Sequence, residues 1–149
     1  MSPAATGPVL RLRIPNRLAA IGEAAEDVAR FCAAHGVPEV AIGHLNLSLD
    51  EAMTNTIEYG WPDGGDHEVL LTIAIGDGAI VAEIGDDGVA FDPLKVPPPD
   101  LESDLESRPI GGLGVHFVKT LMDEVAYRRD GGKNVLTMHK RFVATSARA

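Results

Sequence analysis

The sequence of 149 residues contains a single cysteine, Cys32. A lone cysteine cannot close an internal disulfide, and it excludes a zinc site built from several cysteines. The chain also lacks an apolar run of about 20 residues, which is the length that a membrane-spanning helix needs. Because the first residues carry no positive charge ahead of an apolar stretch, we expect no secretory signal. These absences predict a cytoplasmic protein that contacts no membrane.

Positive charge is scarce as well. The chain has 13 Lys and Arg against 22 Asp and Glu, which gives a formal net charge of −9. Such a surface repels the phosphate backbone of nucleic acids, so we expect no direct nucleic-acid binding. Apolar residues make up 45% of the chain, which is enough to bury a core and argues against intrinsic disorder. An acidic ligand would therefore have to be neutralised by something other than a lysine and arginine cluster.

The spacing of apolar residues predicts the element order β-α-α-β-β-loop-α-β-β. Helices are expected from Leu18 to Gly36, with Asn16 as N-cap, from Pro38 to near Gly60, and directly after Gly114. Strands are expected at 9–14, 69–75, 80–84, 124–129 and 134–142, with glycine-containing hairpin turns at 76–78 and 130–132. This order lacks the strict alternation of a doubly wound parallel sheet. It indicates an α+β fold, a two-layer sandwich with helices on one face of a mixed, largely antiparallel sheet.

The length predicts one domain, at 9–143, between flexible tails at 1–8 and 144–149. Inside it, the segment at about 93–110 is rich in proline and acidic residues and has no apolar period. Long loops of this kind are often lids over ligands. A disordered insertion is the other interpretation of this composition.

Two short patterns could carry chemistry. Glu51 and Asn55 are four residues apart, so they share one face of the second helix, where a carboxylate can take a proton and an amide oxygen can bind a hard cation. Asp86, followed by Asp87 and Gly88, ends a strand and could accept a hydrogen bond from an amino group such as that of a purine. Taken alone, the first pattern is better explained by an exposed polar helix face and the second by an ordinary turn.

A third pattern, Gly112-Leu113-Gly114, opens the third expected helix. Glycines leave backbone N–H groups accessible, and a helix N-terminus carries partial positive charge, so together they could hold a phosphate without lysine or arginine. A glycine-rich hinge is the alternative. The pattern fits neither a P-loop nor a dinucleotide-binding fingerprint.

Taken in order and with their separations, EAMTN (51–55), DDG (86–88) and GLG (112–114) resemble the N, G1 and G2 boxes of the Bergerat ATP-binding fold, the GHKL ATPase superfamily. The compact length and the run RPIGGLGVHFVKTLMDEV (108–125) are similar to the anti-sigma-factor serine/threonine kinases in particular. The resemblance extends over about residues 10–142.

The resemblance implies a role for each matching residue. Glu51 would be the general base, and Asn55 would be a ligand of Mg²⁺. Asp86 would bind the adenine amino group on a turn supported by Gly88. The segment at 93–110 would be the ATP lid. Phosphate contacts would come from Gly112, Leu113 and Gly114, with Arg108 at the terminal phosphate, and Thr137 is the nearest candidate for a threonine that helps to bind adenine.

The chain also departs from the family pattern. Ala90 stands where a second G1 glycine is usual, and Tyr59 stands where a histidine often precedes the N-box glycine. Arg108 is separated from the G2 glycines by Pro109 and Ile110.

The implied function is that of an ATP·Mg²⁺-dependent serine/threonine protein kinase and anti-sigma-type regulator. Such a protein phosphorylates a STAS-type anti-anti-sigma partner and sequesters a sigma factor or another regulator, as a homodimer. Two alternatives remain open: a nucleotide-gated binding protein with little kinase activity, and a detached histidine-kinase-like catalytic domain.

Overall fold

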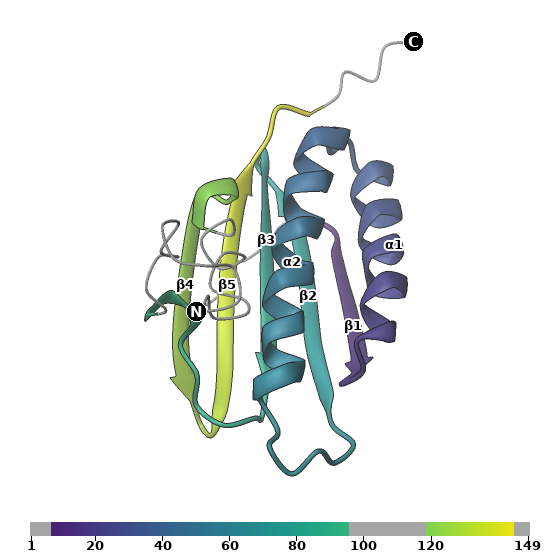
Figure 1. Ribbon diagram of the computed structural model, residues 1–149. Coiled ribbons are helices and arrows are strands. Elements are labelled where there is room, and N and C mark those ends of the chain that lie inside the picture. Colours follow the sequence, from purple (N-terminus) through teal and green to yellow (C-terminus); the bar gives the residue numbers. More distant parts are fainter. Residues whose placement is uncertain (1–6, 96–118, 145–149) are drawn as a thin grey trace, which may run out of the picture.

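The computed structural model describes residues 7–95 and 119–144 (Figure 1). Two α-helices, α1 (Ala19–Ala34) and α2 (Glu39–Tyr59), follow the first strand, and a short 3-10 helix, η1, spans Pro93–Lys95. The five strands are β1 (Val9–Pro15), β2 (Glu68–Gly76), β3 (Ala79–Asp86), β4 (Glu124–Asp130) and β5 (Lys133–Arg141). They form one sheet in the order β1-β2-β3-β5-β4.

The predicted α+β sandwich is confirmed, and α1 and α2 lie on the same face of the sheet (Figure 1). The expected sheet was mixed and largely antiparallel, and every neighbouring pair of described strands is in fact antiparallel. Two helices of opposite direction separate β1 from β2, so the chain re-enters the sheet antiparallel to β1. The remaining described neighbours are joined by hairpins or by the return of β5 alongside β3.

The core lies between the helices and this face of the sheet. Alternation along β2 explains the part of the core that the sheet contributes. Val69, Leu71, Ile73 and Ile75 are buried, while Leu70 between them is exposed on the opposite face. The buried partners from the other elements include Val28, Leu45, Leu49, Met53, Ile80, Ile84 and Met138. Over 7–95 and 119–144, no helix is long and apolar enough to cross a membrane.

Both hairpin turns form where they were predicted. Asp77 and Gly78 connect β2 to β3 with φ angles of 52° and 73°. Gly131 and Gly132 connect β4 to β5 with φ angles of 57° and 79°. Two successive residues with positive φ define the turn whose twist matches that of the flanking strands. These turns fix the register of β2 against β3 and of β4 against β5.

The predicted helix cap at Asn16 is wrong. α1 begins after Leu18, which makes no side-chain cap hydrogen bond. The Asn16 side chain instead donates to the Gly65 carbonyl oxygen at 2.9 Å and accepts from the His67 backbone N–H at 3.0 Å. The Asn16 backbone N–H also donates to the His67 carbonyl oxygen, which continues the β1–β2 pairing past Pro15. This pairing places the Asn16 side chain beside Gly65 and His67 and not at the start of α1.

Candidate functional site

The second half of α2 carries the first two predicted site residues. Asn55 faces the sheet and is only 4% exposed, so its amide lies at the wall of a pocket rather than on the outer helix face. Glu51, one turn earlier, is partly buried. The helical spacing that placed both residues on one face therefore brings a carboxylate and an amide to the same side of the helix.

The environment of Glu51 favours its protonated form. Burial raises the pKa of the Glu51 carboxyl above its ordinary value, and the neighbouring carboxylates of Asp50 and Glu58 raise it further. Desolvation and like charges both disfavour ionisation. A carboxylate whose pKa is raised in this way is a better proton acceptor, as a general base requires.

Asp86 ends β3 and is 7% exposed. Its Oδ1 accepts hydrogen bonds from the Gly88 backbone N–H and from Nδ2 of Asn134, both at 2.9 Å. The first of these bonds closes the turn that leads the chain away from the sheet, as expected for the Asp86-Asp87-Gly88 pattern.

Asn55 and Asp86 line the same pocket, at the end of the sheet beside α2. The space inside the pocket that water can enter is about 30 Å³. Its walls are apolar apart from a few polar groups, and its apolar lining includes Ala52, Ile84, Val89, Phe91 and Leu136. An apolar slot with a few convergent polar groups suits a flat heteroaromatic ring that carries a hydrogen-bond donor.

A larger hollow lies on the other face of the sheet, with a volume of about 560 Å³. It is open to solvent and mixes charges of both signs, and Arg13 in its wall pairs with Glu68 at 2.9 Å. Asn55 does not reach it, and Glu51 lines neither of the two hollows. The smaller pocket is therefore the candidate site, because it unites residues from two of the predicted motifs.

Two glycines bring α2 and the turn after β3 into backbone contact. The Val89 N–H donates to the Gly60 carbonyl oxygen at 2.8 Å. A Cβ atom built on Gly88 would lie 2.6 Å from the same oxygen and 2.9 Å from Gly60 Cα. The φ angle of Gly88 is not positive, so this position needs glycine for the close approach and not for its left-handed conformation. Ala90 is exposed and has no positive φ either.

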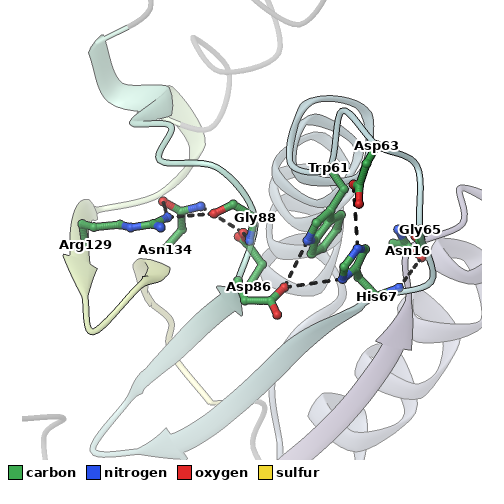
Figure 2. Close-up of polar contacts among 10 residues, drawn as sticks. Asn16, Trp61, Asp63, Gly65, His67, Asp86, Gly88, Arg129 and Asn134 are labelled. Carbon is green, nitrogen blue, oxygen red and sulfur yellow. Dashed lines mark hydrogen bonds and ion pairs between the residues drawn. The ribbon is translucent and has the colours of Figure 1, made fainter.

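Trp61 and His67 support the same turn from the other side (Figure 2). Trp61 is 9% exposed, its Nε1 donates to Asp87 Oδ1 at 3.0 Å, and its ring stacks on His67 with the centroids 4.8 Å apart. His67 Nδ1 lies 3.9 Å from Asp87 Oδ1. The loop between α2 and β2 thereby holds Asp87 away from the pocket and leaves Asp86 facing it.

Asn134 is the polar pocket residue that sequence reasoning missed. It is 7% exposed and lies directly opposite Asp86 in the β3–β5 pairing. Its side chain links Asp86 to β4 and to the segment after the turn, and Figure 2 shows it between Asp86 and Arg129. Asn134, Leu136 and Met138 all face inward along β5, but the alternate set contains the apolar Val135, so sequence alternation did not single out Asn134.

Thr137, the predicted adenine contact, is not brought to the pocket. It pairs with Glu83 on β3 and Ala126 on β4. Its side chain lies on the face of the sheet opposite Asn134, because successive residues of a strand alternate between faces. The pocket contains its neighbour Leu136 instead. Arg108, Gly112, Leu113 and Gly114 lie outside the described residues, as does most of the expected lid at 93–110.

Comparisons with known proteins agree with this geometry. Residues 14–140 match the family described as histidine kinase-like ATPase domain. The chain is 31% identical over 100 residues to the serine-protein kinase RsbW of Listeria monocytogenes, which covers 64% of each protein. It is 28% identical over 99 residues to RsbW of Bacillus thuringiensis, covering 64% of this chain and 61% of that protein. The matches thus span somewhat less than two thirds of these relatives.

Solved structures show the same fold. The RsbU and RsbW domains of a Mycobacterium tuberculosis protein superpose with a TM-score of 0.66 and 15% identity, over 93% of this chain and 33% of that one. The histidine kinase AdeS of Acinetobacter baumannii superposes with a TM-score of 0.50 and 14% identity, over 91% of this chain and 68% of that one.

Proposed function

Because the chain belongs to the family of histidine kinase-like ATPase domains, we propose that the pocket between α2 and the end of β3 binds ATP. One observation carries the proposal. Asn55 and Asp86 are distant in sequence, yet both line this one pocket. The family resemblance implies that Asn55 is a ligand of the cation and that Asp86 binds adenine.

Adenine would be read by Asp86. Its carboxylate accepts hydrogen bonds, so it would accept from the exocyclic amino group, while apolar side chains such as Ile84 and Leu136 cover the ring. If the base carried an oxygen in place of the amino group, that oxygen and the Asp86 carboxylate would both be acceptors and could form no hydrogen bond. The pocket is therefore suited to adenine and unsuited to guanine.

The donor set of the described residues fits a cation held mainly by phosphate and water. Asn55 offers an amide oxygen, a ligand type that Mg²⁺ accepts, and magnesium sites commonly take one or two protein ligands alongside substrate phosphates. No group of three or more His, Cys, Asp or Glu in the described part of the chain could hold a metal. Bound Mg²⁺ would supply the positive charge that an acidic chain with a net charge of −9 otherwise lacks at the phosphates.

Glu51 would act as general base in phosphoryl transfer. An acceptor hydroxyl oxygen would form a bond to the γ-phosphorus, the bond between that phosphorus and the β,γ-bridging oxygen would break, and the hydroxyl proton would pass to Glu51. The raised pKa of the Glu51 carboxyl suits this step. As the family resemblance implies, we propose that Gly112, Leu113 and Gly114 would contact phosphate and that Arg108 would contact the terminal phosphate.

At the level of the whole protein, we propose a cytoplasmic serine/threonine protein kinase of the anti-sigma type. It would form a homodimer, phosphorylate a STAS-type anti-anti-sigma protein and sequester a sigma factor or another regulator. The relatives named serine-protein kinase RsbW support this proposal. Phosphate added to a partner would be repelled by the acidic surface of this chain, which gives phosphorylation a way to release the partner.

A transfer experiment tests the proposal. The protein is incubated with [γ-³²P]ATP·Mg²⁺ and a STAS-type candidate partner, and acid-stable phosphate on the partner is the expected result. Acid-labile phosphate would indicate phosphohistidine and a histidine-kinase-like catalytic domain. Tight ATP binding with no transfer to any partner would favour the alternative of a nucleotide-gated binding protein.

A further inference from the structure

The Asn134 side chain uses its whole hydrogen-bonding capacity inside the protein. Its Nδ2 donates to Asp86 Oδ1 at 2.9 Å and to the Val89 carbonyl oxygen at 2.8 Å. Its Oδ1 accepts from Arg129 Nη1 at 3.1 Å, from the Phe91 backbone N–H at 3.3 Å and from the Tyr127 hydroxyl. An asparagine side chain has two N–H donors and one acceptor oxygen, so both ends are saturated.

These partners fix which way the amide points. Turned over, its oxygen would face the Asp86 carboxylate and the Val89 carbonyl, two acceptors. Its nitrogen would then face the donors of Arg129 and Phe91. Each mismatch would leave buried polar groups unpaired, which is costly where water is excluded. Arg129 Nη1 also donates to the Gly88 carbonyl at 2.8 Å, so it braces the turn as well as the amide (Figure 2).

The fixed amide in turn orients Asp86. Both hydrogen bonds that the described residues make to this carboxylate end on Oδ1, one from Asn134 and one from the Gly88 N–H. A donor on a ligand would therefore meet Oδ2. Since neither N–H of Asn134 is left over, the amide has no donor of its own to offer to a ring oxygen.

Resting on the proposed function, we infer that Asn134 is the positioning residue that makes the site discriminate between amino and oxo purines. It holds Asp86 as a pure acceptor turned toward the base, and it withholds its own amide from the base. Both effects reject a purine with oxygen at C6. Without Asn134, the Asp86 side chain could rotate away from such an oxygen, or admit a water molecule between them, and tolerate it.

Inosine triphosphate is the appropriate probe, because it differs from ATP at this position by an oxygen in place of the amino group. The dissociation constants of both nucleotides with Mg²⁺ are measured by calorimetry for wild type and Asn134→Ala. The wild-type ratio in favour of ATP is expected to be about 100-fold, because the oxygen at C6 would leave the buried acceptor of Asp86 without a donor. In Asn134→Ala this ratio of dissociation constants is expected to fall about tenfold, because inosine triphosphate would be rejected less strongly.

Two further variants keep the result interpretable. Thr137→Ala alters the same strand on the opposite face and is expected to leave the ratio unchanged. Tyr127→Phe removes one donor to the amide oxygen while both Nδ2 bonds remain, and it is expected to lower the ratio by a smaller factor. If Asn134→Ala does not fold, Tyr127→Phe decides, and an unchanged ratio in it overturns the inference.

The failures are distinguishable. Equal weakening of both nucleotides in Asn134→Ala would mean that Asn134 only stabilises the fold, and it would overturn the inference alone. If the wild-type protein bound ATP and inosine triphosphate equally well, the inference would also be overturned, but the proposal that the pocket binds nucleotide would stand. Wild-type protein that binds neither nucleotide would overturn the proposed function and the inference together.

Discussion

Gly88→Ala adds one methyl group at the contact between the turn after β3 and the end of α2. The added Cβ would lie 2.6 Å from the Gly60 carbonyl oxygen and 2.9 Å from both Gly60 C and Gly60 Cα. All three are backbone atoms, so no flexible side chain can move aside. Overpacking of this kind costs about 1–3 kcal/mol. Separating the two segments would also weaken the hydrogen bond from Val89 to Gly60, a further cost of about 1 kcal/mol.

A loss of roughly 3 kcal/mol corresponds to a fall in melting temperature of about 6–12 °C for a protein of this size. Thermal unfolding followed by circular dichroism measures it. ATP affinity should fall in the same variant even well below the melting temperature, because Val89 lines the pocket and the Gly88 N–H holds Asp86.

Gly43→Ala is the matched control. Gly43 lies inside α2, and a Cβ atom built there has nothing within 4 Å. The same substitution should therefore stabilise the protein by up to about 1 kcal/mol through helix propensity. The same glycine-to-alanine change is therefore expected to lower the melting temperature at position 88 and to raise it at position 43. A Gly88→Ala protein as stable as wild type, with unchanged ATP affinity, would show that the two segments can separate freely and would refute the reasoning.

Three other predictions concern single side chains. Glu51→Gln should abolish phosphoryl transfer while ATP still binds. Folding raises the pKa of the Glu51 carboxyl, so the folded protein binds the carboxyl proton more tightly than the unfolded chain does. The free energy of unfolding therefore decreases as the pH rises from about 4.5 through the raised pKa. Glu51→Gln should then melt higher than wild type at pH 7 and no higher at pH 4, and an identical difference at both pH values would contradict this. Asn55→Ala should lower ATP affinity in Mg²⁺ about tenfold or more, measured by calorimetry with and without the cation; an unchanged Mg²⁺ dependence would remove its role. Burial raises the pKa of the Cys32 thiol to about 11, so a thiol reagent at pH 8 should label it only as fast as the protein unfolds, and rapid labelling of native protein would count against a buried Cys32.

Much of the fold could be predicted because its elements have clear periods. The alternation of Val69, Leu71 and Ile73 identifies a strand with one buried face, and Asp77-Gly78 marks a hairpin of the turn type observed. The family resemblance, based on three short motifs, is confirmed by the match over residues 14–140. The cap at Asn16 could not be predicted correctly, because its competing partners, Gly65 and His67, are distant in the sequence.

For the site, prediction of side-chain placement was possible where one element decides the geometry. Glu51 and Asn55 share a helix face through helical spacing alone. It failed where strand register decides: along β5, both alternating sets of residues contain apolar side chains, so the sequence does not say whether Asn134 or Thr137 faces the helices. The pairing of Asp86 with Asn134 answers that question, and it depends on strands 48 positions apart.

The strand order has a consequence for how the site comes into being during synthesis. β5 is the last strand of the described chain, yet it lies between β3 and β4 and supplies the residue that orients Asp86. A nascent chain that ends before β5 has β3 exposed as a sheet edge and Asp86 without its partner from Asn134. Pairings between distant segments form late, because the connecting chain must be ordered first. We therefore expect the proposed nucleotide pocket to form only after β5 has left the ribosome, so that partly made chains do not compete for nucleotide.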